Sequence, residues 1–329
     1  MKLFTPRRPP LRAKLIRRPR SVTGAVRSEP DRVLTAFFWT CASSLCFSGM
    51  SVFVKDLSLT LPQFELVFFR TVITTLVFLP VLVSTKQTFF PKGKRLLIFR
   101  GLAGFGGVSC LFYGNAHLPL AVVALLNWCS LLFVILISYF FLNEKLRPTS
   151  LLWALVAAFG LALLVSPESF QRSTSILHAP LPLFAVGISL LGALFSSLAV
   201  TAVRAATARF GASLIIFYFS IISAIVAAPL AAAQWIWPHG TEWMELLAMG
   251  LLGSAAQFAM TQGYRHAPAG LVSTMGLMTA VFSSVLGWSI FGERLAWIQW
   301  IGRLTVGAGV AAATLSSKER ASQVLPAQA

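Results

Sequence analysis

The feature that most constrains this chain is a succession of ten apolar segments, each long enough to cross a bilayer. A hydrocarbon core is about 30 Å thick, and about 20 apolar residues span it as a helix. Of the 329 residues, 57% are hydrophobic and 11% are charged, and so few charges do not suit a water-facing surface. The predicted spans are 33–54, 62–83, 96–117, 120–142, 149–166, 181–203, 212–236, 243–264, 269–291 and 296–315.

These segments predict helices because lipid offers the backbone no hydrogen-bond partner. A spanning segment must therefore be a helix or part of a closed barrel. The segments are apolar throughout and do not alternate with polar residues, which argues against a barrel. We predict an all-α integral membrane protein with ten transmembrane helices.

The formal net charge of +17 indicates membrane orientation rather than binding of nucleic acid. Ten of the 27 Lys and Arg residues lie within 1–32, and most of the others lie in short loops. Loops on the opposite side of the predicted topology hold only Lys55, Arg172 and Arg294. Because basic loops stay on the inside, both termini are predicted to be cytoplasmic. We expect the protein in the bacterial inner (plasma) membrane.

The two ends of the chain are predicted to lie outside the bundle. Residues 1–32 are rich in Arg and Pro, which predicts a disordered basic tail that contacts anionic lipid headgroups. An organelle transit peptide has a similar composition and remains an alternative. Residues 316–329 are predicted to form a second cytoplasmic tail.

An internal repeat appears when the chain is shifted by 149 residues, which aligns the first five spans with the last five. Proline residues and charged residues then align with one another at equivalent helix ends. The offset pairs Pro80 with Pro229, Gly101 with Gly250, Gly104 with Gly253, Phe133 with Phe282, Glu144 with Glu293, Gly160 with Gly309 and Lys55 with Arg204. The predicted repeats are 33–166 and 181–315. Because five is odd, the second repeat is inverted, which is the architecture of alternating access.

Several motifs resemble a known family. They are Arg100-Gly101-Leu102-Ala103-Gly104, Phe141-Leu142-Asn143-Glu144-Lys145-Leu146, Tyr264-Arg265-His266-Ala267-Pro268-Ala269-Gly270 and Phe291-Gly292-Glu293-Arg294-Leu295. Each half resembles an EamA domain, and two such units in tandem resemble the drug/metabolite transporter (DMT) superfamily. The resemblance covers roughly residues 33–315.

The resemblance implies ten helices, cytoplasmic termini and a central cavity walled by helices of both halves. We expect spans one, three, four, six, eight and nine to line this cavity, and the fifth helix of each half to be peripheral. The family usually carries a proline in the fourth helix of each unit, where this chain has Leu131 and Ala280. Since proline bends helices, spans four and nine are expected to be straighter here.

Polar side chains at lipid depth are costly and therefore mark candidate binding residues. The candidates for solute binding are Arg70, Ser109, Tyr113, Asn127, Trp128, Ser130 and Gln257. An alternative interpretation is that Arg70 reaches toward the interface or pairs with Glu65, and that the other groups join helices by hydrogen bonds. Arg303, equally deep in span ten, is expected to pack or to reach the interface.

No catalytic residue, metal site or cofactor is predicted. The acidic residues all fall in loops or at helix ends, and the four cysteines form no CxxC pair. Glu144 and Glu293 each precede a cation after an apolar span, which favours a salt-bridged turn or a helix cap over catalysis. Because no carboxylate lies near the midplane, transport is predicted to be facilitative or exchange-type.

The sequence therefore predicts a secondary transporter for a small organic metabolite, such as an amino acid, an amphipathic solute or a drug-like solute. Two other classes remain as alternatives. A membrane-embedded enzyme acting on lipid requires a nucleophile–base pair or metal ligands at one depth. A structural or receptor-like membrane protein has no need of an inverted repeat. The solute, its direction and the oligomeric state are left unassigned.

Overall fold

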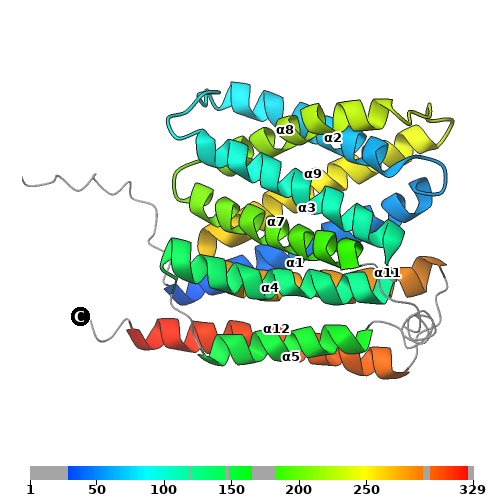
Figure 1. The fold of residues 1–329 in the computed structure, drawn as a ribbon. Coiled ribbons are helices and arrows are strands. Elements are labelled where there is room, and N and C mark those ends of the chain that lie inside the picture. The colour runs from blue at the N-terminus through cyan, green and yellow to red at the C-terminus, as the bar shows by residue number, and fades with distance from the viewer. Residues whose placement is uncertain (1–28, 119, 145–147, 165–182, 292–296, 325–329) are drawn as a thin grey trace, which may run out of the picture.

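The computed structural model describes residues 29–118, 120–144, 148–164, 183–291 and 297–324, and this part of the chain is all α-helical. The helices are α1 (Glu29–Leu57), α2 (Gln63–Ser84), α3 (Arg95–His117), α4 (Leu120–Leu142), α5 (Pro148–Leu164), α7 (Leu183–Thr207), α8 (Ala212–Ala232), α9 (Glu242–His266), α10 (Ala269–Gly276), α11 (Met278–Phe291) and α12 (Trp297–Val324). They lie side by side in one bundle, with α5 and α12 together along one edge (Figure 1).

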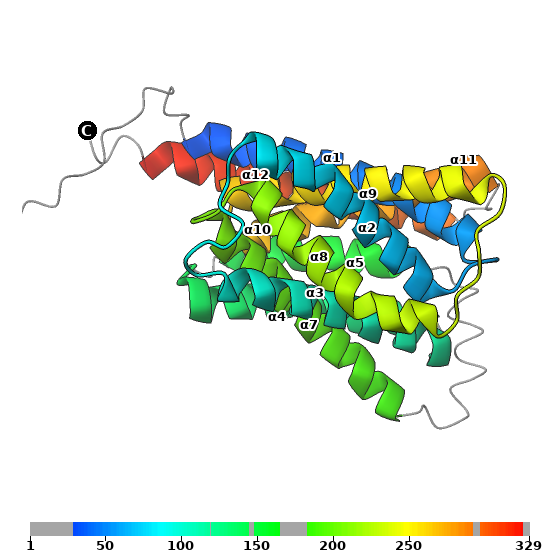
Figure 2. The ribbon, with the colours of Figure 1, turned by 90° about the horizontal axis from the view of Figure 1, so that it is seen from above.

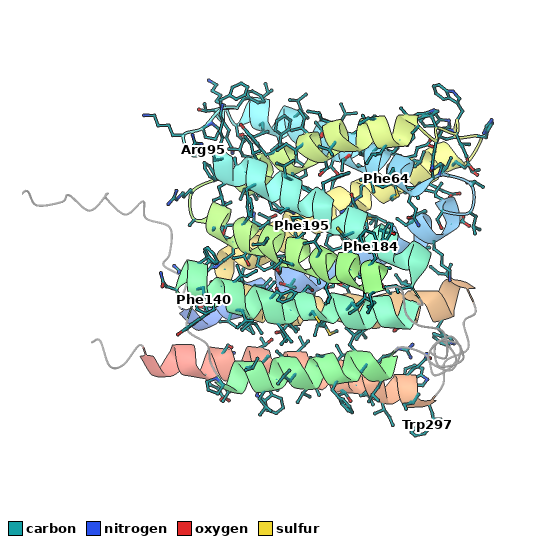
Figure 3. All side chains as sticks on the ribbon, viewed as in Figure 1. Phe64, Arg95, Phe140, Phe184, Phe195 and Trp297 are labelled. Atoms are coloured by element: carbon teal, nitrogen blue, oxygen red, sulfur yellow. The ribbon has the colours of Figure 1, made fainter. Side chains whose placement is uncertain are left out.

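The lengths and composition of the helices agree with an integral, multi-pass membrane protein. Six candidate spans occur among the described residues, in α1, α2, α7, α8, α9 and the α10–α11 pair. Large apolar side chains cover the outside of the bundle, and Phe140, Phe184 and Trp297 are each more than 70% exposed (Figure 3). Such a surface suits lipid rather than water.

The two halves run in opposite directions through the bundle. The last turn of α1 holds Lys55, whereas the last turn of α7 holds Arg204, which lies beside Glu144 near the start of α10. We call these two ends of the bundle the Lys55 end and the Glu144 end. The start of α1 and the end of α12 lie together at the Glu144 end (Figures 1 and 2).

Close glycine contacts make the repeat visible in three dimensions. A Cβ atom on Gly101 would lie 2.8 Å from the Ile222 side chain, and one on Gly250 would lie 2.6 Å from Ile73. Both the two glycines and the two isoleucines are 149 residues apart in the sequence. The α3–α8 and α2–α9 interfaces are therefore repeat-related copies of one another.

A second repeat-related pair of glycines joins α5 to α12. A Cβ on Gly160 would lie 2.6 Å from the backbone nitrogen of Val306, and one on Gly309 would lie 2.8 Å from that of Ala157. Here backbone meets backbone, as expected where glycine permits close helix approach in a membrane. α5 and α12 pack as one unit.

The predicted boundaries need some correction. α1 begins at Glu29, so residues 29–32 belong to a helix rather than to the predicted tail, and α12 continues past residue 315 to Val324. Polar residues extend these helices because their ends leave the apolar layer and meet water. The rest of the predicted basic tail lies outside the described residues.

The structure divides span nine into α10 and α11 at Leu277, whose backbone angles stay helical (φ −61°, ψ −19°), and the straighter course expected for spans four and nine stays a prediction. Around the break the amides bond three residues back, from Leu277 to Thr274 and from Ala280 to Leu277. No proline is needed, because Gly276 has the lowest helix propensity after proline. From α1, the Ser48 hydroxyl donates to the Thr279 carbonyl at 3.0 Å and so supports the altered turn.

Candidate functional site

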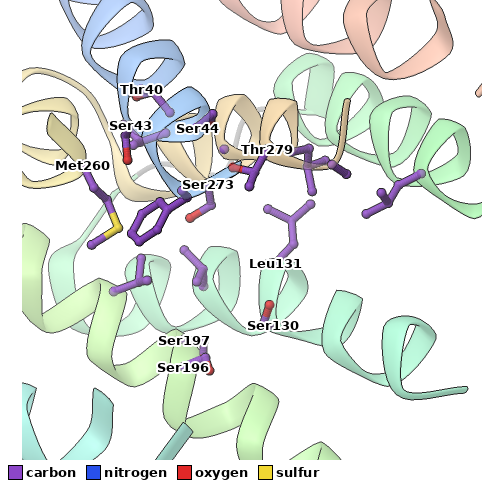
Figure 4. Close-up of a pocket in the computed structure, with 18 of the residues that line it drawn as sticks. Thr40, Ser43, Ser44, Ser130, Leu131, Ser196, Ser197, Met260, Ser273 and Thr279 are labelled. Carbon is purple, nitrogen blue, oxygen red and sulfur yellow. The ribbon is translucent and has the colours of Figure 1, made fainter. Parts of the chain in front are cut away.

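A cavity of about 470 Å³ lies within the bundle, between the two halves (Figure 4). α1, α4 and α5 of the first half and α7, α9, α10 and α11 of the second half line it. Its lining residues include Thr40, Ser43, Ser44, Phe47, Ser130, Leu131, Val134, Ala158, Leu161, Ser196, Ser197, Val200, Met260, Tyr264, Val272, Ser273, Gly276, Leu277, Thr279, Ala280 and Ser283. A cavity of this size matches the usual range for small-molecule sites.

The polar groups of the lining are almost all hydroxyls. α1 contributes Thr40, Ser43 and Ser44, and serines or threonines also come from α4, α7, α10 and α11. Between them lie apolar surfaces such as Phe47 and Met260, and no charged or histidine side chain stands among the residues that form this wall. The cavity can thus hold apolar surface while offering several hydrogen bonds.

Some of these hydroxyls already bond to protein, and others do not. Thr40 donates to the Ala36 carbonyl at 2.7 Å, and Ser43 donates to the Ala256 carbonyl at 2.9 Å. Tyr264 and Ser273 share a hydrogen bond of 3.0 Å. Within the described part of the chain, the hydroxyls of Ser44 and Ser130 have no such partner, so they are available to a solute.

The break between α10 and α11 lies at the cavity wall. Ser273, Gly276, Leu277 and Thr279 all contact the cavity. A Cβ placed on Gly276 would meet nothing within 4 Å, so this glycine faces open space. Irregular backbone at membrane depth is tolerated where it lines a cavity, and interrupted helices commonly form transporter sites.

A hydrogen-bond network around Glu144 joins four helices at one end of the bundle. The Arg204 Nε atom lies 2.9 Å from Glu144 Oε1, and the Ala269 amide donates to Glu144 Oε2 at 2.9 Å. Arg204 Nη1 also donates to the Tyr264 carbonyl at 2.8 Å. We call these four residues the Glu144 clasp, and it joins α4, α7, α9 and α10.

Local structure aims Glu144 at its partners. α4 ends at Leu142, and the next residue, Asn143, has a positive φ of 52°, a conformation that asparagine tolerates better than most residues. The Glu144 amide then donates back to the Ser138 carbonyl. The carboxylate meets the first amide of α10, where a helix N-terminus favours negative charge.

The clasp adjoins the cavity directly, because Tyr264 belongs to both. Its carbonyl accepts the bond from Arg204, and its side chain lines the cavity. Glu144 and Arg204 keep 18% and 28% of their side-chain surface exposed, so the ion pair is partly shielded from water. The clasp therefore lies against the cavity wall at the Glu144 end.

The predicted solute-binding residues fall in different places. Ser130 lines the cavity, as predicted for a binding residue. Ser109 is on α3 with an unpartnered hydroxyl, and Tyr113 packs edge-on against Phe184 at a centroid distance of 6.1 Å. Gln257 is buried on α9 outside the lining. The side chains of Asn127 and Trp128 lie outside the part that the structure describes.

Arg70 does not pair with Glu65, which was the alternative interpretation of this arginine. Glu65 is fully buried, and its Oε2 atom accepts a hydrogen bond from the Ile236 amide at 3.1 Å. Arg70 instead lies over the Phe47 ring, 5.9 Å from its centroid. Arg303 packs over Trp300 and donates to Ser284, in agreement with the packing role expected for it.

Two helices differ from the expected cavity walls. None of the described side chains of α3 lines the cavity, whereas α5 contributes Ala158 and Leu161 although it was expected to be peripheral. The hydroxyl stripe of α1 was also missed. Thr40, Ser43, Ser44 and Phe47 follow the spacing i, i+3, i+4 and i+7, which puts them on one helix face. The spacing could be recognised in the sequence, but serine and threonine in membrane helices more often join neighbouring helices than bind a solute.

An all-helical bundle of two inverted repeats around a shared cavity defines a small-molecule membrane transporter. The chain belongs to the EamA-like transporter family, whose sequence profile matches residues 34–166 and 183–315. This confirms the predicted EamA resemblance. A crystal structure with a TM-score of 0.75 and 19% identity covers 88% of this chain and 99% of its own, which shows the fold.

Relatives with named functions support the same class. The pseudopaline exporter CntI of Pseudomonas aeruginosa is 33% identical over 270 residues, covering 82% of this chain and 89% of the relative. An S-adenosylmethionine uptake transporter of Rickettsia felis is 26% identical over 261 residues, covering 79% and 85%. Solute carrier family 35 member G1 of Mus musculus is 28% identical over 307 residues, covering 88% and 82%.

Proposed function

We propose that this protein is a secondary transporter that carries a small organic metabolite through the hydroxyl-lined cavity by alternating access. The observation that carries the proposal is that residues of both inverted halves line one cavity, with a clasp between the halves beside it. In such a repeat, rocking of one half against the other exposes a fixed site to each side in turn.

The charge distribution supports an orientation with the Glu144 end in the cytoplasm. The loops at this end carry most of the basic residues outside the tail, including Lys92, Lys94, Arg209 and Arg265. The clasp is then a cytoplasmic gate, and the bacterial inner membrane is the proposed location. A basic N-terminal tail on this side would contact anionic lipid headgroups.

The chemistry of the cavity supports facilitative or exchange transport rather than catalysis or proton coupling. Its described wall holds hydroxyls without the neighbouring base that a nucleophile requires. It also holds no carboxylate that would relay a proton through the midplane. The protein is therefore proposed to move its solute unchanged, down the gradient of that solute or against a second solute.

Reconstitution into liposomes tests this function. Vesicles loaded with a metabolite mixture, with and without the protein, are compared for solutes that appear on the other side, and each hit is tested by counterflow. We expect flux that persists when an ionophore abolishes the pH gradient. Chemical conversion of a solute without flux would support the enzyme alternative, and flux that requires an imposed proton gradient would refute the facilitative mechanism.

A further inference from the structure

The loop between α2 and α3 belongs to a strongly basic surface at the Glu144 end of the bundle. Six exposed cations of this loop and of two neighbouring segments form what we call the basic surface. They are Lys86, Lys92, Lys94, Arg95, Arg209 and Arg265 (Figure 3 labels Arg95). The three segments that carry them, 85–95, 207–211 and 262–267, contain no acidic residue. The charges of one sign therefore add up over this surface.

The three segments pack together, so the cations belong to one surface. A Cβ atom on Gly93 of the α2–α3 loop would lie 3.7 Å from the Phe210 ring. The Phe210 carbonyl in turn accepts a hydrogen bond of 3.0 Å from Arg265 Nη2. A Cβ atom on Gly211 would lie 3.1 Å from the side-chain amide of Gln87. These contacts hold cations of α9, of the α2–α3 loop and of the α7–α8 loop next to one another.

Aromatic rings lie among these cations. Phe90 is 75% exposed, and the Lys94 ammonium group lies 5.2 Å from the centre of its ring. The Phe89 carbonyl accepts a hydrogen bond of 2.6 Å from the Tyr218 hydroxyl, and the Phe89 ring packs edge-on against Phe217. The loop is thereby fixed to α8, while Phe90 stays exposed. A cation beside an exposed ring suits the boundary between lipid headgroups and acyl chains.

The repeat-related loop at the Lys55 end has no cations at the equivalent positions. At the offset of 149 residues, Lys86, Lys92, Lys94 and Arg95 correspond to Trp235, Thr241, Trp243 and Met244. Tryptophan is a common anchor of helix ends at a membrane interface. The same position in the fold is thus occupied by neutral residues in the other half, so the architecture does not require the four cations.

We propose that the basic surface binds the phosphate headgroup of an anionic phospholipid, with Phe90 against the acyl chains. Phosphate oxygens accept charge-assisted hydrogen bonds from lysine and arginine. A lipid is favoured over a soluble acidic partner because an exposed ring lies among the cations, at the ends of membrane-spanning helices. The proposal goes beyond transport, since none of the six cations is among the residues that line the cavity.

Thermal unfolding of the purified full-length protein in neutral detergent micelles tests the class of ligand. The micelles are doped with dioleoylphosphatidylglycerol or with dioleoylphosphatidylcholine, and two further samples receive inorganic phosphate or a polyglutamate peptide. We expect only phosphatidylglycerol to raise the unfolding midpoint, by several degrees, because a ligand that binds the folded state stabilises it. Equal shifts with both lipids, as expected if these cations act only as topology signals during insertion, would overturn the proposal. An equal or larger shift with phosphate or polyglutamate would also overturn it.

Two charge-matched variants separate the basic surface from the basic N-terminal residues. One neutralises three exposed lysines of the surface, and the other neutralises three arginines of residues 1–32. They are Lys86→Gln/Lys92→Gln/Lys94→Gln and Arg7→Gln/Arg8→Gln/Arg12→Gln. We expect the surface variant to lose most of the phosphatidylglycerol shift with an unchanged lipid-free midpoint, and the N-terminal variant to keep the shift. The opposite pattern would assign the lipid to the N-terminal residues and refute the site.

Two further measurements keep the test decisive if the glutamine variant folds poorly. The variant Lys86→Arg/Lys92→Arg/Lys94→Arg preserves the charges and should keep the shift. In the unaltered protein, added sodium chloride should reduce the shift, because salt screens exposed charges. Loss of the shift in the arginine variant at an unchanged lipid-free midpoint, or a shift that salt does not alter, would contradict binding through charge.

Discussion

The contacts between the two halves are of two kinds, and they differ in what they allow. The glycine contacts occur as repeat-related pairs, with Gly101 matched by Gly250 and Gly160 matched by Gly309. The Glu144 clasp joins helices at one end through charge and hydrogen bonds. In an inverted repeat, the inward-open and outward-open states are related by exchanging the conformations of the two halves. A contact that occurs in both halves can persist through this exchange, whereas a contact at one end must break when that end opens.

The paired glycine interfaces and the Glu144 clasp are therefore expected to be the rigid and the movable parts of the transporter. We expect the α5–α12 pair and the α2–α9 and α3–α8 interfaces to act as rigid frameworks, because backbone meets backbone in the first and each glycine of the other two packs tightly against an isoleucine side chain. In the proposed mechanism the clasp is the movable gate, since ion pairs that reach water exchange partners at low cost. The repeat places Lys55 and Glu293 as the counterparts of Arg204 and Glu144 at the other end, where a second gate is expected.

The largest expected effect comes from filling the cavity between the gates. Gly276→Phe places a ring in the open space at the α10–α11 break and should reduce flux by about 100-fold or more while the protein still folds. Gly307→Phe is the matched control, because a Cβ there also meets nothing within 4 Å but Gly307 is not a lining residue. Equal loss of flux in both variants would argue against the cavity as the path.

The next largest effect should follow from breaking the clasp. Glu144→Gln removes the ion pair to Arg204, and loss of a partly buried charged hydrogen bond costs about 1–3 kcal/mol. We expect the population open at the Glu144 end to rise about ten-fold, seen as faster labelling of a cavity cysteine from that side. Arg265→Gln is the control, because the Arg265 side chain donates to the Phe210 carbonyl at the same end, and only its backbone carbonyl contacts Arg204 of the clasp. No change in Glu144→Gln would remove the gate assignment.

A smaller and opposite effect is expected at the other end. Lys55→Gln changes the repeat counterpart of Arg204, so it should favour opening at the Lys55 end. Lys55 is exposed, and exposed ion pairs contribute about 0.2–1 kcal/mol, so the shift should be a few-fold at most. Labelling rates from the two sides measure the direction. A shift in the same direction as Glu144→Gln would contradict two repeat-related gates.

The smallest effect on gating is expected in the framework. Gly160→Ala brings a methyl group against the Val306 backbone and should destabilise the fold by about 1–3 kcal/mol without changing which end is open. Thermal unfolding measures the loss, and Gly187→Ala, which meets open space, should be neutral. A change in sidedness of labelling in Gly160→Ala would place α5 and α12 among the moving parts.

Most of the fold was predictable because lipid leaves the backbone few choices. Apolar length located the helices, and a single offset revealed the inverted repeat. The break at Leu277 was not predictable from the missing proline, because Gly276 and the Ser48 hydroxyl of a distant helix supply the cause. Membrane composition alone does not distinguish a bent helix from a straight one.

The candidate site was less predictable, because a cavity depends on which helix faces meet. Ser130 was identified by its depth, but Ser44 and Ser273 resemble ordinary packing hydroxyls in the sequence. Glu144 was expected in a salt-bridged turn or as a helix cap, and it does form an ion pair and accept from the first amide of α10, but its described ion-pair partner is Arg204, 60 residues away. Pairings across the halves follow from packing, which local sequence does not contain.

The most direct test of the gate is the sidedness of access to the cavity. Ser130→Cys is placed in a chain whose four native cysteines are replaced by alanine, and membrane vesicles of known orientation are treated with an impermeant thiol reagent. With Glu144 intact, we predict slow labelling from the cytoplasmic side, and with Glu144→Gln we predict labelling from that side at least several-fold faster. Rapid cytoplasmic labelling with the clasp intact, or a rate that does not respond to Glu144→Gln, would contradict the account.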